Sequence, residues 1–149
     1  MTIQEIQEEI INEFKIFDNW IDKYKYLIKL GKDLSPMDLK YIKKDYLVKD
    51  CQITTWSRSI FKNGKVFYDI DSSSIIIKGM IVLLKRILSG QKPKDIKNAD
   101  LYFIDKAGLR ESCSPARIND FWKLVNQLKL DATLYVGKQK DVLKPANNL

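Results

Sequence analysis

Thiols are the side chains in this 149-residue sequence that point most directly to covalent chemistry, and there are two of them, Cys51 and Cys113. The chain has no histidine, so it lacks the commonest general base and the commonest metal ligand. Two cysteines fall short of the ligand set of a structural zinc site, and an iron–sulfur scaffold needs a similar number of soft ligands. What remains is the chemistry of one thiol, assisted by a lysine, an arginine or a partner protein.

Cys51 is the stronger candidate because it lies in a predicted loop, within the sequence V-K-D-C-Q at 48–52. Loops held by a rigid scaffold commonly carry function. A free cysteine is more often a small buried hydrophobic residue, and composition alone favours that interpretation. For Cys113, a small buried residue just before a helix is the favoured interpretation, and a second thiol that acts together with Cys51 is the alternative.

The composition is that of a soluble globular protein, with 45% hydrophobic and 30% charged residues, and the length suits one domain. The N-terminal segment is acidic and does not start like a signal peptide. The longest apolar stretch, 75–88, is interrupted by basic residues and is too short to span a bilayer. We therefore expect a cytoplasmic protein with no membrane association, in which both cysteines are reduced.

The net charge of +7 raises nucleic acid as a partner. The lysines are scattered through three segments, 23–49, 78–106 and 123–144, and no RNA-binding or zinc-finger signature accompanies them. A solvated basic surface is therefore the favoured interpretation, and an acidic protein partner is the alternative. We expect no nucleic-acid partner.

The N-terminal half predicts helices followed by a small sheet. Apolar residues at helical spacing predict a helix at 3–15 and a second one that ends at Gly31. Short strands are predicted at 46–48, 53–61 and 66–68, and Asn63-Gly64 between the last two is a strong hairpin signal. Cys51 then lies in the connection between the first and second of three antiparallel strands.

The C-terminal half predicts helices. The stretch 75–88 is apolar on nearly every side, as in a buried helix, and Gly79 within it permits close packing. Ser114-Pro115 begins a last helix, and the lysine-rich segment 131–149 is expected to be a partly frayed tail. The predicted fold is a single α+β domain over 1–149, with helices packed on one face of the sheet.

Four stretches, in order, resemble the SufE family. Residues 20–34 read WIDKYKYLIKLGKDL, similar to the family's W-x-x-(K/R)-Y-x-x-L-I-x-L-G. Residues 48–56 read VKDCQITTW, similar to V-x-G-C-Q-S-x-V-W, and residues 71–83 read DSSSIIIKGMIVL, similar to D-S-D-x-x-I-V-K-G-x-x-A-L. Residues 114–117 read SPAR, similar to (S/T)-P-(S/T)-R. The resemblance covers roughly residues 5–130.

The resemblance implies a fold like that of the IscU-type iron–sulfur scaffold proteins, but no bound cluster. It implies that Cys51 accepts sulfur from the persulfide of a PLP-dependent, SufS-like cysteine desulfurase, and that the protein stimulates that enzyme. The sulfur then passes to a downstream Suf scaffold complex for iron–sulfur cluster assembly. The PLP belongs to the partner, so the chain itself needs no cofactor and no metal, and acts as an accessory sulfurtransferase. Whether it forms a homodimer is left open.

The resemblance also assigns supporting residues. Arg117 matches the family's arginine, and we predict that it holds Cys51 as a thiolate or stabilises the persulfide, with a structural ion pair as the alternative. Gln52 and Trp56 match the cysteine motif, Trp56 as a packing residue. Lys78 matches with Gly79, where helix packing is expected.

The sequence departs from the family pattern at two glycines. Asp50 replaces the glycine before the cysteine, where it adds a negative charge that should raise the thiol pKa and slow attack on a persulfide. Asp120 replaces the glycine in the last helix, and Ile53 and Ser73 also depart from the motifs. These changes keep a second hypothesis open: a regulatory module that binds the desulfurase without efficient sulfur transfer.

Overall fold

The computed structural model describes residues 1–138 and 142–145, and it confirms the predicted α+β fold. Two helices come first, α1 (Ile3–Phe14) and α2 (Trp20–Lys32). A capping box begins α1: the Thr2 side chain accepts the Glu5 backbone N–H at 3.0 Å, and the Glu5 side chain accepts the Thr2 backbone N–H at 2.9 Å.

A long antiparallel hairpin forms most of the sheet. It consists of β1 (Thr55–Lys62) and β2 (Lys65–Ser72). Asn63 and Gly64 both have positive φ at the turn, 54° and 75°, as a tight hairpin with this sequence requires. A short third strand, β3 (Val142–Pro145), pairs with the other edge of β1 and gives the strand order β2-β1-β3.

The prediction of a strand at 46–48 was wrong. Residues Lys44–Tyr46 form a 3₁₀ turn, and Leu47 makes only an isolated antiparallel bridge with Trp56. Three consecutive apolar residues are too few to extend that bridge into a ladder, because Lys49 and Asp50 already turn away into the loop. The predicted tail at 131–149 begins inside a helix that continues to Tyr135, while residues 139–141 and 146–149 lie outside the described part of the chain.

The other α-helices follow the hairpin. Their bounds are α3 (Ile75–Leu88), α4 (Pro93–Lys97), α5 (Phe103–Lys106) and α6 (Pro115–Tyr135), with 3₁₀ turns at Leu39–Tyr41 and Arg110–Ser112. As predicted, α6 begins at Ser114 and Pro115, where the Ser114 Oγ accepts a bond from the Arg117 N–H at 3.3 Å.

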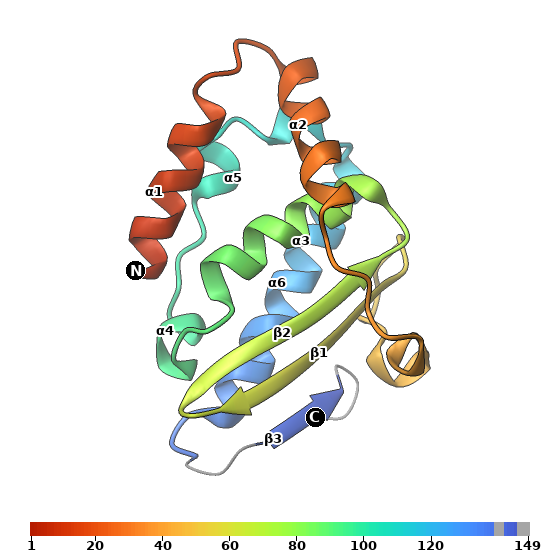
Figure 1. Ribbon diagram of the computed structural model, residues 1–149, viewed down its shortest axis with the longest axis vertical. Coiled ribbons are helices and arrows are strands. Elements are labelled where there is room, and N and C mark those ends of the chain that lie inside the picture. The colour runs from red at the N-terminus through yellow and green to blue at the C-terminus, as the bar shows by residue number, and fades with distance from the viewer. Residues whose placement is uncertain (139–141, 146–149) are drawn as a thin grey trace.

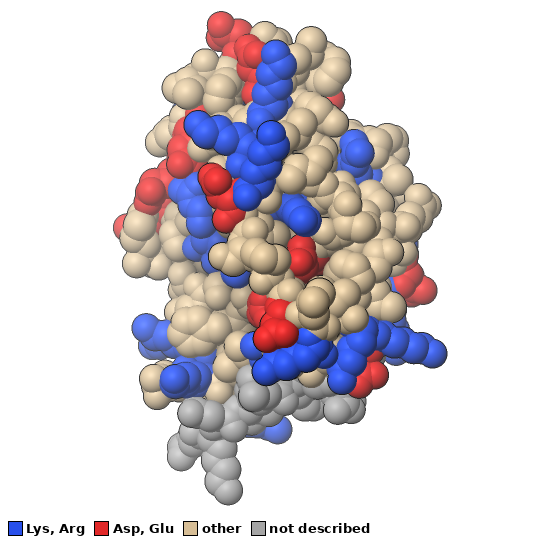
Figure 2. Space-filling model, turned by 45° about the vertical axis from the view of Figure 1, so that its right-hand side comes forward, with Lys and Arg blue, Asp and Glu red and all other residues tan. Residues whose placement is uncertain are grey.

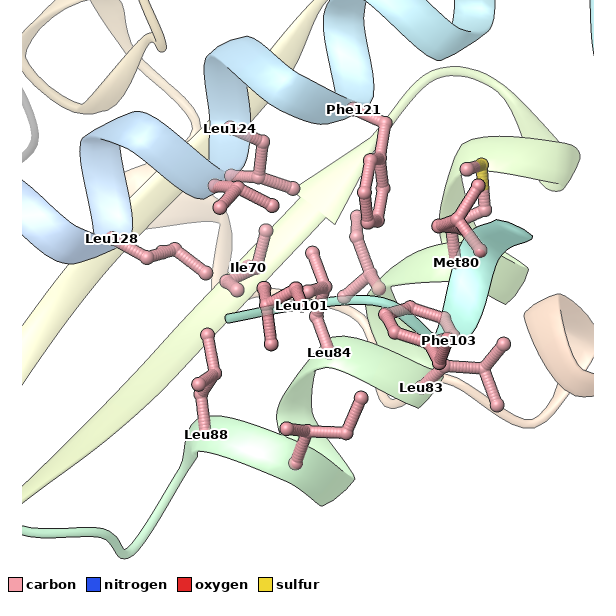
Figure 3. Packing of buried hydrophobic residues seen from close by; sticks show 14 of the residues in the cluster. Ile70, Met80, Leu83, Leu84, Leu88, Leu101, Phe103, Phe121, Leu124 and Leu128 are labelled. Atoms are coloured by element: carbon pink, nitrogen blue, oxygen red, sulfur yellow. The ribbon is translucent and has the colours of Figure 1, made fainter. Parts of the chain in front are cut away.

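The core lies between the hairpin and the helices behind it. In Figure 1, α3 and α6 lie behind the β1–β2 hairpin, with α1 and α2 on the side of α3 away from it. Every second residue of β1 is buried, and most residues of β2 are buried, as expected for strands with one covered face. Figure 3 shows Phe121, Leu124 and Leu128 of α6 directed toward the leucines of α3, which fixes the position of α6.

Two glycines allow α2 and α3 to touch backbone to backbone. A Cβ on Gly79 would collide with the carbonyl oxygen of Leu27, and one on Gly31 would collide with that of Ile75. The close packing predicted for Gly79 is therefore confirmed. Gly31, predicted to end its helix, instead lies inside α2 and serves the same contact.

We expect Gly79→Ala to destabilise the protein by about 2 kcal/mol, because the added methyl must push the two helix backbones apart. This cost exceeds the roughly 1 kcal/mol that alanine gains over glycine in a helix. Urea unfolding of Gly79→Ala and Gly31→Ala checks the prediction, with the exposed Lys29→Ala on α2 as the control. Unchanged stability in both glycine variants would contradict it.

The basic residues form no single patch on the face shown in Figure 2. Lys and Arg side chains lie there in several groups, with acidic side chains beside them. This distribution suits a solvated surface better than a continuous phosphate-binding track. Among the described residues, no helix is both long enough and apolar enough to cross a membrane.

Candidate functional site

Cys51 lies in a loop, residues 49–54, that is closed at its base. The Val48 N–H donates to the Thr55 carbonyl at 2.9 Å, and the Leu47–Trp56 bridge lies directly outside this bond. The chain therefore leaves and re-enters the sheet region at one point. Cys51 is half-buried and packs against the hydrophobic core, whereas Gln52 beside it is exposed.

Asp50 has the backbone conformation that favours glycine. Its φ is +65°, in the left-handed region, which aspartate tolerates better than most residues. This conformation explains why a glycine suits the position before the cysteine. The Asp50 carbonyl accepts a hydrogen bond from the Lys123 ammonium of α6, which holds this side of the loop.

Asp120 of α6 holds the other side of the loop. Its side chain is only 2% exposed, and its two carboxylate oxygens accept the N–H groups of Gln52 at 2.9 Å and Ile53 at 2.6 Å. The Cys51 thiol donates to the Asp120 backbone carbonyl, with Sγ and O 3.8 Å apart. Asp120 thus contacts three consecutive residues of the loop.

Sequence reasoning treated Asp120 only as a lost glycine and missed this role. A signal was present in the helical spacing of the last helix. Phe121, Leu124, Val125 and Leu128 form its buried stripe, and position 120 falls on the same stripe, four residues before Leu124. An acidic residue on a buried face needs hydrogen-bond partners, and here the loop supplies them.

The surroundings of Cys51 keep its thiol protonated at rest. Burial, followed by the negative charge of Asp120, raises the pKa of Cys51 to about 11. The Lys123 ammonium lowers this pKa, and the Asp50 carboxylate raises it by the smallest contribution. The predicted effect of Asp50 therefore has the correct sign, but burial and Asp120 act more strongly.

Arg117 acts on the other cysteine in this structure. Burial raises the pKa of Cys113 to about 11, and the Arg117 guanidinium opposes that rise. The Cys113 sulfur is 3.9 Å from the Met80 sulfur, a contact with the core of α3. Lys123 rather than Arg117 is the cation that acts on Cys51, so the role predicted for Arg117 at Cys51 stays a prediction.

Three other motif residues, Lys78, Asp71 and Trp56, lie at the end of the hairpin. Lys78 forms an ion pair with Asp71, with the ammonium nitrogen and Oδ1 3.9 Å apart. The second oxygen of Asp71 accepts the Met37 N–H at 3.1 Å. Trp56 is half-buried and faces Asp71 across the β1–β2 pair. These contacts are structural and hold the segment before the Cys51 loop against the hairpin.

The described residues contain no group of three or more cysteine, aspartate or glutamate side chains that could hold a metal ion. What the site does contain is one half-buried thiol, two nearby carboxylates and one ammonium group. This arrangement suits thiol chemistry whose activation depends on a change in the surroundings of the sulfur.

Comparison with known proteins decides the family. Residues 8–132 match the SufE domain, described as the Fe–S metabolism associated domain. The chain belongs to the SufE family. It is 32% identical to the cysteine desulfuration protein SufE of Wigglesworthia glossinidia brevipalpis over 133 residues, which cover 87% of this chain and 92% of that one. Membership in the SufE family supports a sulfur-transfer role in iron–sulfur metabolism.

Two further matches are consistent with this assignment. The chain is 34% identical to the SufE-like protein 1, chloroplastic/mitochondrial, of Arabidopsis thaliana over 124 residues, covering 83% of this chain and 33% of that longer protein. A solution structure of a hypothetical protein from Thermus thermophilus has a TM-score of 0.71 at 17% identity, covering 88% of this chain and 96% of the other. The second match concerns the fold alone.

Proposed function

We propose that this SufE family protein is a sulfur carrier that takes sulfane sulfur from the persulfide of a cysteine desulfurase onto Cys51. The observation that carries the proposal is the loop itself. The motif cysteine lies in a loop closed at its base, held by α6 on both sides, and is only half-buried. A thiol placed in this way can reach a partner when the loop moves, while the rest of the fold stays fixed.

The transfer is a thiol–disulfide type of exchange. The Cys51 thiolate attacks the terminal sulfur of the desulfurase persulfide, and a bond forms between the Cys51 sulfur and that sulfur. The sulfur–sulfur bond of the desulfurase persulfide breaks, and its electron pair leaves with the desulfurase cysteine as a thiolate. The transferred sulfur keeps its hydrogen, so Cys51 becomes a persulfide, and no net oxidation or reduction takes place.

Activation of Cys51 requires loss of its proton before this attack, because the thiolate is the nucleophile. Lys123 is the cation that favours the thiolate in the resting structure. We retain Arg117 in the proposal as a cation for the persulfide, a role that needs a rearrangement because its charge acts on Cys113 here.

The partner follows from the chemistry and from the family. A persulfide donor supplies the substrate, and SufE family proteins work with cysteine desulfurases. The next acceptor receives the sulfur from Cys51 for iron–sulfur cluster assembly, and the PLP of the reaction belongs to the donor enzyme. We further propose that the exchange takes place in the cytoplasm.

A second function is favoured by the two carboxylates at the site. Asp120 and Asp50 both raise the pKa of Cys51, which opposes sulfur acceptance. A regulatory module would bind the desulfurase through the same surface and transfer sulfur poorly. The two functions differ in one observable, the formation of a persulfide on this chain.

Intact-mass spectrometry without reductant tests the proposal. The purified chain is incubated with the host cysteine desulfurase and cysteine, and its mass is followed over time. A gain of one or more sulfur atoms supports the carrier role. No gain, although a complex with the desulfurase is detected on a sizing column, would leave the regulatory module as the function of this chain.

A further inference from the structure

Two side chains of α6 form hydrogen bonds with the Cys51 loop on both sides of the thiol; we call these bonds the grip of α6 on the loop. Lys123 donates to the Asp50 carbonyl before the cysteine, and Asp120 accepts the Gln52 and Ile53 amides after it. Asp120 and Lys123 are three residues apart and so lie on one face of the helix. Because α6 is anchored in the core through Phe121 and its neighbours, the grip is fixed to the rigid part of the fold.

The carboxylate of Asp120 makes this grip costly to release. Both oxygens are used by loop amides, and the side chain is almost completely buried. If the loop leaves, a buried carboxylate loses its partners, which is unfavourable unless water or a partner protein replaces them. Glycine, the family's residue at this position, has no such group.

The grip also orients the sulfur. The Cys51 thiol donates to the backbone carbonyl of Asp120, so the protonated form is the one that fits the resting arrangement. The charged groups that act on the thiol are Asp120 and Lys123 from α6 and Asp50 from the loop itself. Two of these three groups carry a negative charge, so a Cys51 thiolate would lie among charged groups whose net charge is negative.

We infer that Asp120 is a positioning residue that holds the Cys51 loop closed with its thiol turned toward α6. Cys51 reacts only when the hydrogen bonds from the Gln52 and Ile53 N–H groups to the Asp120 carboxylate are broken. This inference rests on the proposed function for its biological meaning. If the loop opens only in contact with the sulfur donor, the Cys51 thiol is protected from electrophiles other than the donor's persulfide. The hydrogen bonds of Asp120 with the loop amides and with the thiol are a property of the free chain and can be tested without the donor.

A role of Asp120 as a general base is the competing explanation. Both carboxylate oxygens already accept hydrogen bonds from backbone amides, and the thiol donates to the backbone carbonyl of Asp120 rather than to its carboxylate. The two explanations predict opposite results. Removing a base slows the reaction of Cys51, whereas removing the hold accelerates it.

The test uses the free chain in a Cys113→Ser background, so that Cys51 is the only thiol. Rates of alkylation by iodoacetamide are measured from pH 7 to pH 9 for Asp120→Asn and for Asp120→Gly, which restores the family's residue. We expect alkylation at pH 7.5 to be about tenfold faster in Asp120→Asn, because one negative charge and one amide acceptor are lost. Hydrogen exchange at the Gln52 and Ile53 amides should accelerate in both variants.

Asp50→Asn is the matched control. It removes a carboxylate that also acts on Cys51, but that carboxylate bonds neither of the two amides. We expect a smaller increase in alkylation and unchanged exchange at Gln52 and Ile53. Thermal unfolding identifies any variant that does not fold, and the nearly isosteric Asp120→Asn carries the test if the glycine variant fails.

Alkylation that is unchanged or slower in a folded Asp120→Asn would overturn the inference. So would unchanged amide exchange in that variant. Because neither measurement involves the desulfurase, both stand apart from the mass experiment that tests sulfur transfer. If wild type and variants gain no sulfur while alkylation and exchange behave as expected, the proposed function fails and the hold of Asp120 stands.

Discussion

Cys51→Ser is expected to abolish the gain of sulfur from the desulfurase completely. The serine hydroxyl is smaller than the thiol but is a stronger hydrogen-bond donor, so it can still donate toward the Asp120 carbonyl. It cannot form a sulfur–sulfur bond. Intact-mass spectrometry after incubation with the desulfurase and cysteine should therefore show one unmodified mass for this variant and an added sulfur for the wild type.

Cys113→Ser provides the control for this result. Cys113 has the same raised pKa as Cys51, so acidity does not distinguish the two thiols, and their positions must. Cys113 contacts the sulfur of Met80 in the core, whereas Cys51 lies in the loop. The Cys113→Ser chain should gain sulfur as the wild type does. A gain that survives in Cys51→Ser and disappears in Cys113→Ser would move the carrier role to Cys113 and contradict the proposal.

The parts of the fold that were predicted correctly depend on neighbours in the sequence. The hairpin follows from Asn63-Gly64, and the last helix from Ser114-Pro115, because both are local conformational preferences. The third strand was misplaced for the opposite reason. β3 and β1 pair although they are far apart in the sequence. A lysine-rich segment near the C-terminus has no local sequence feature that indicates this pairing.

The candidate site divides in the same way. The position of Cys51 in a loop was predicted from the flanking apolar residues and from the family motif. The two charged residues that act most strongly on its thiol, Asp120 and Lys123, come from α6, and Asp120 is 68 positions from Gln52 in the sequence. The motif comparison gave only the negative fact that a glycine was missing, since a side chain that the family lacks has no motif of its own.

Alkylation of Cys51 is expected to increase steeply with pH. Burial and the charge of Asp120 raise the pKa of Cys51 to about 11, and the thiolate is the form that reacts. Below its pKa the thiolate fraction of a thiol rises about tenfold per pH unit, so the rate should rise about a thousandfold from pH 7 to pH 10. Iodoacetamide kinetics on the Cys113→Ser chain measure this rate for Cys51 alone.

The same chain unfolded in urea is the control, because its thiol should follow an ordinary pH profile that levels off about two pH units lower. A plateau below about pH 9 in the folded chain would show that Lys123 outweighs burial and the two carboxylates, contrary to our expectation. The desulfurase reaction should respond differently. If the partner breaks the bonds between Asp120 and the loop, sulfur acceptance should rise with pH less steeply than alkylation does, because the thiol that accepts sulfur no longer lies against that carboxylate.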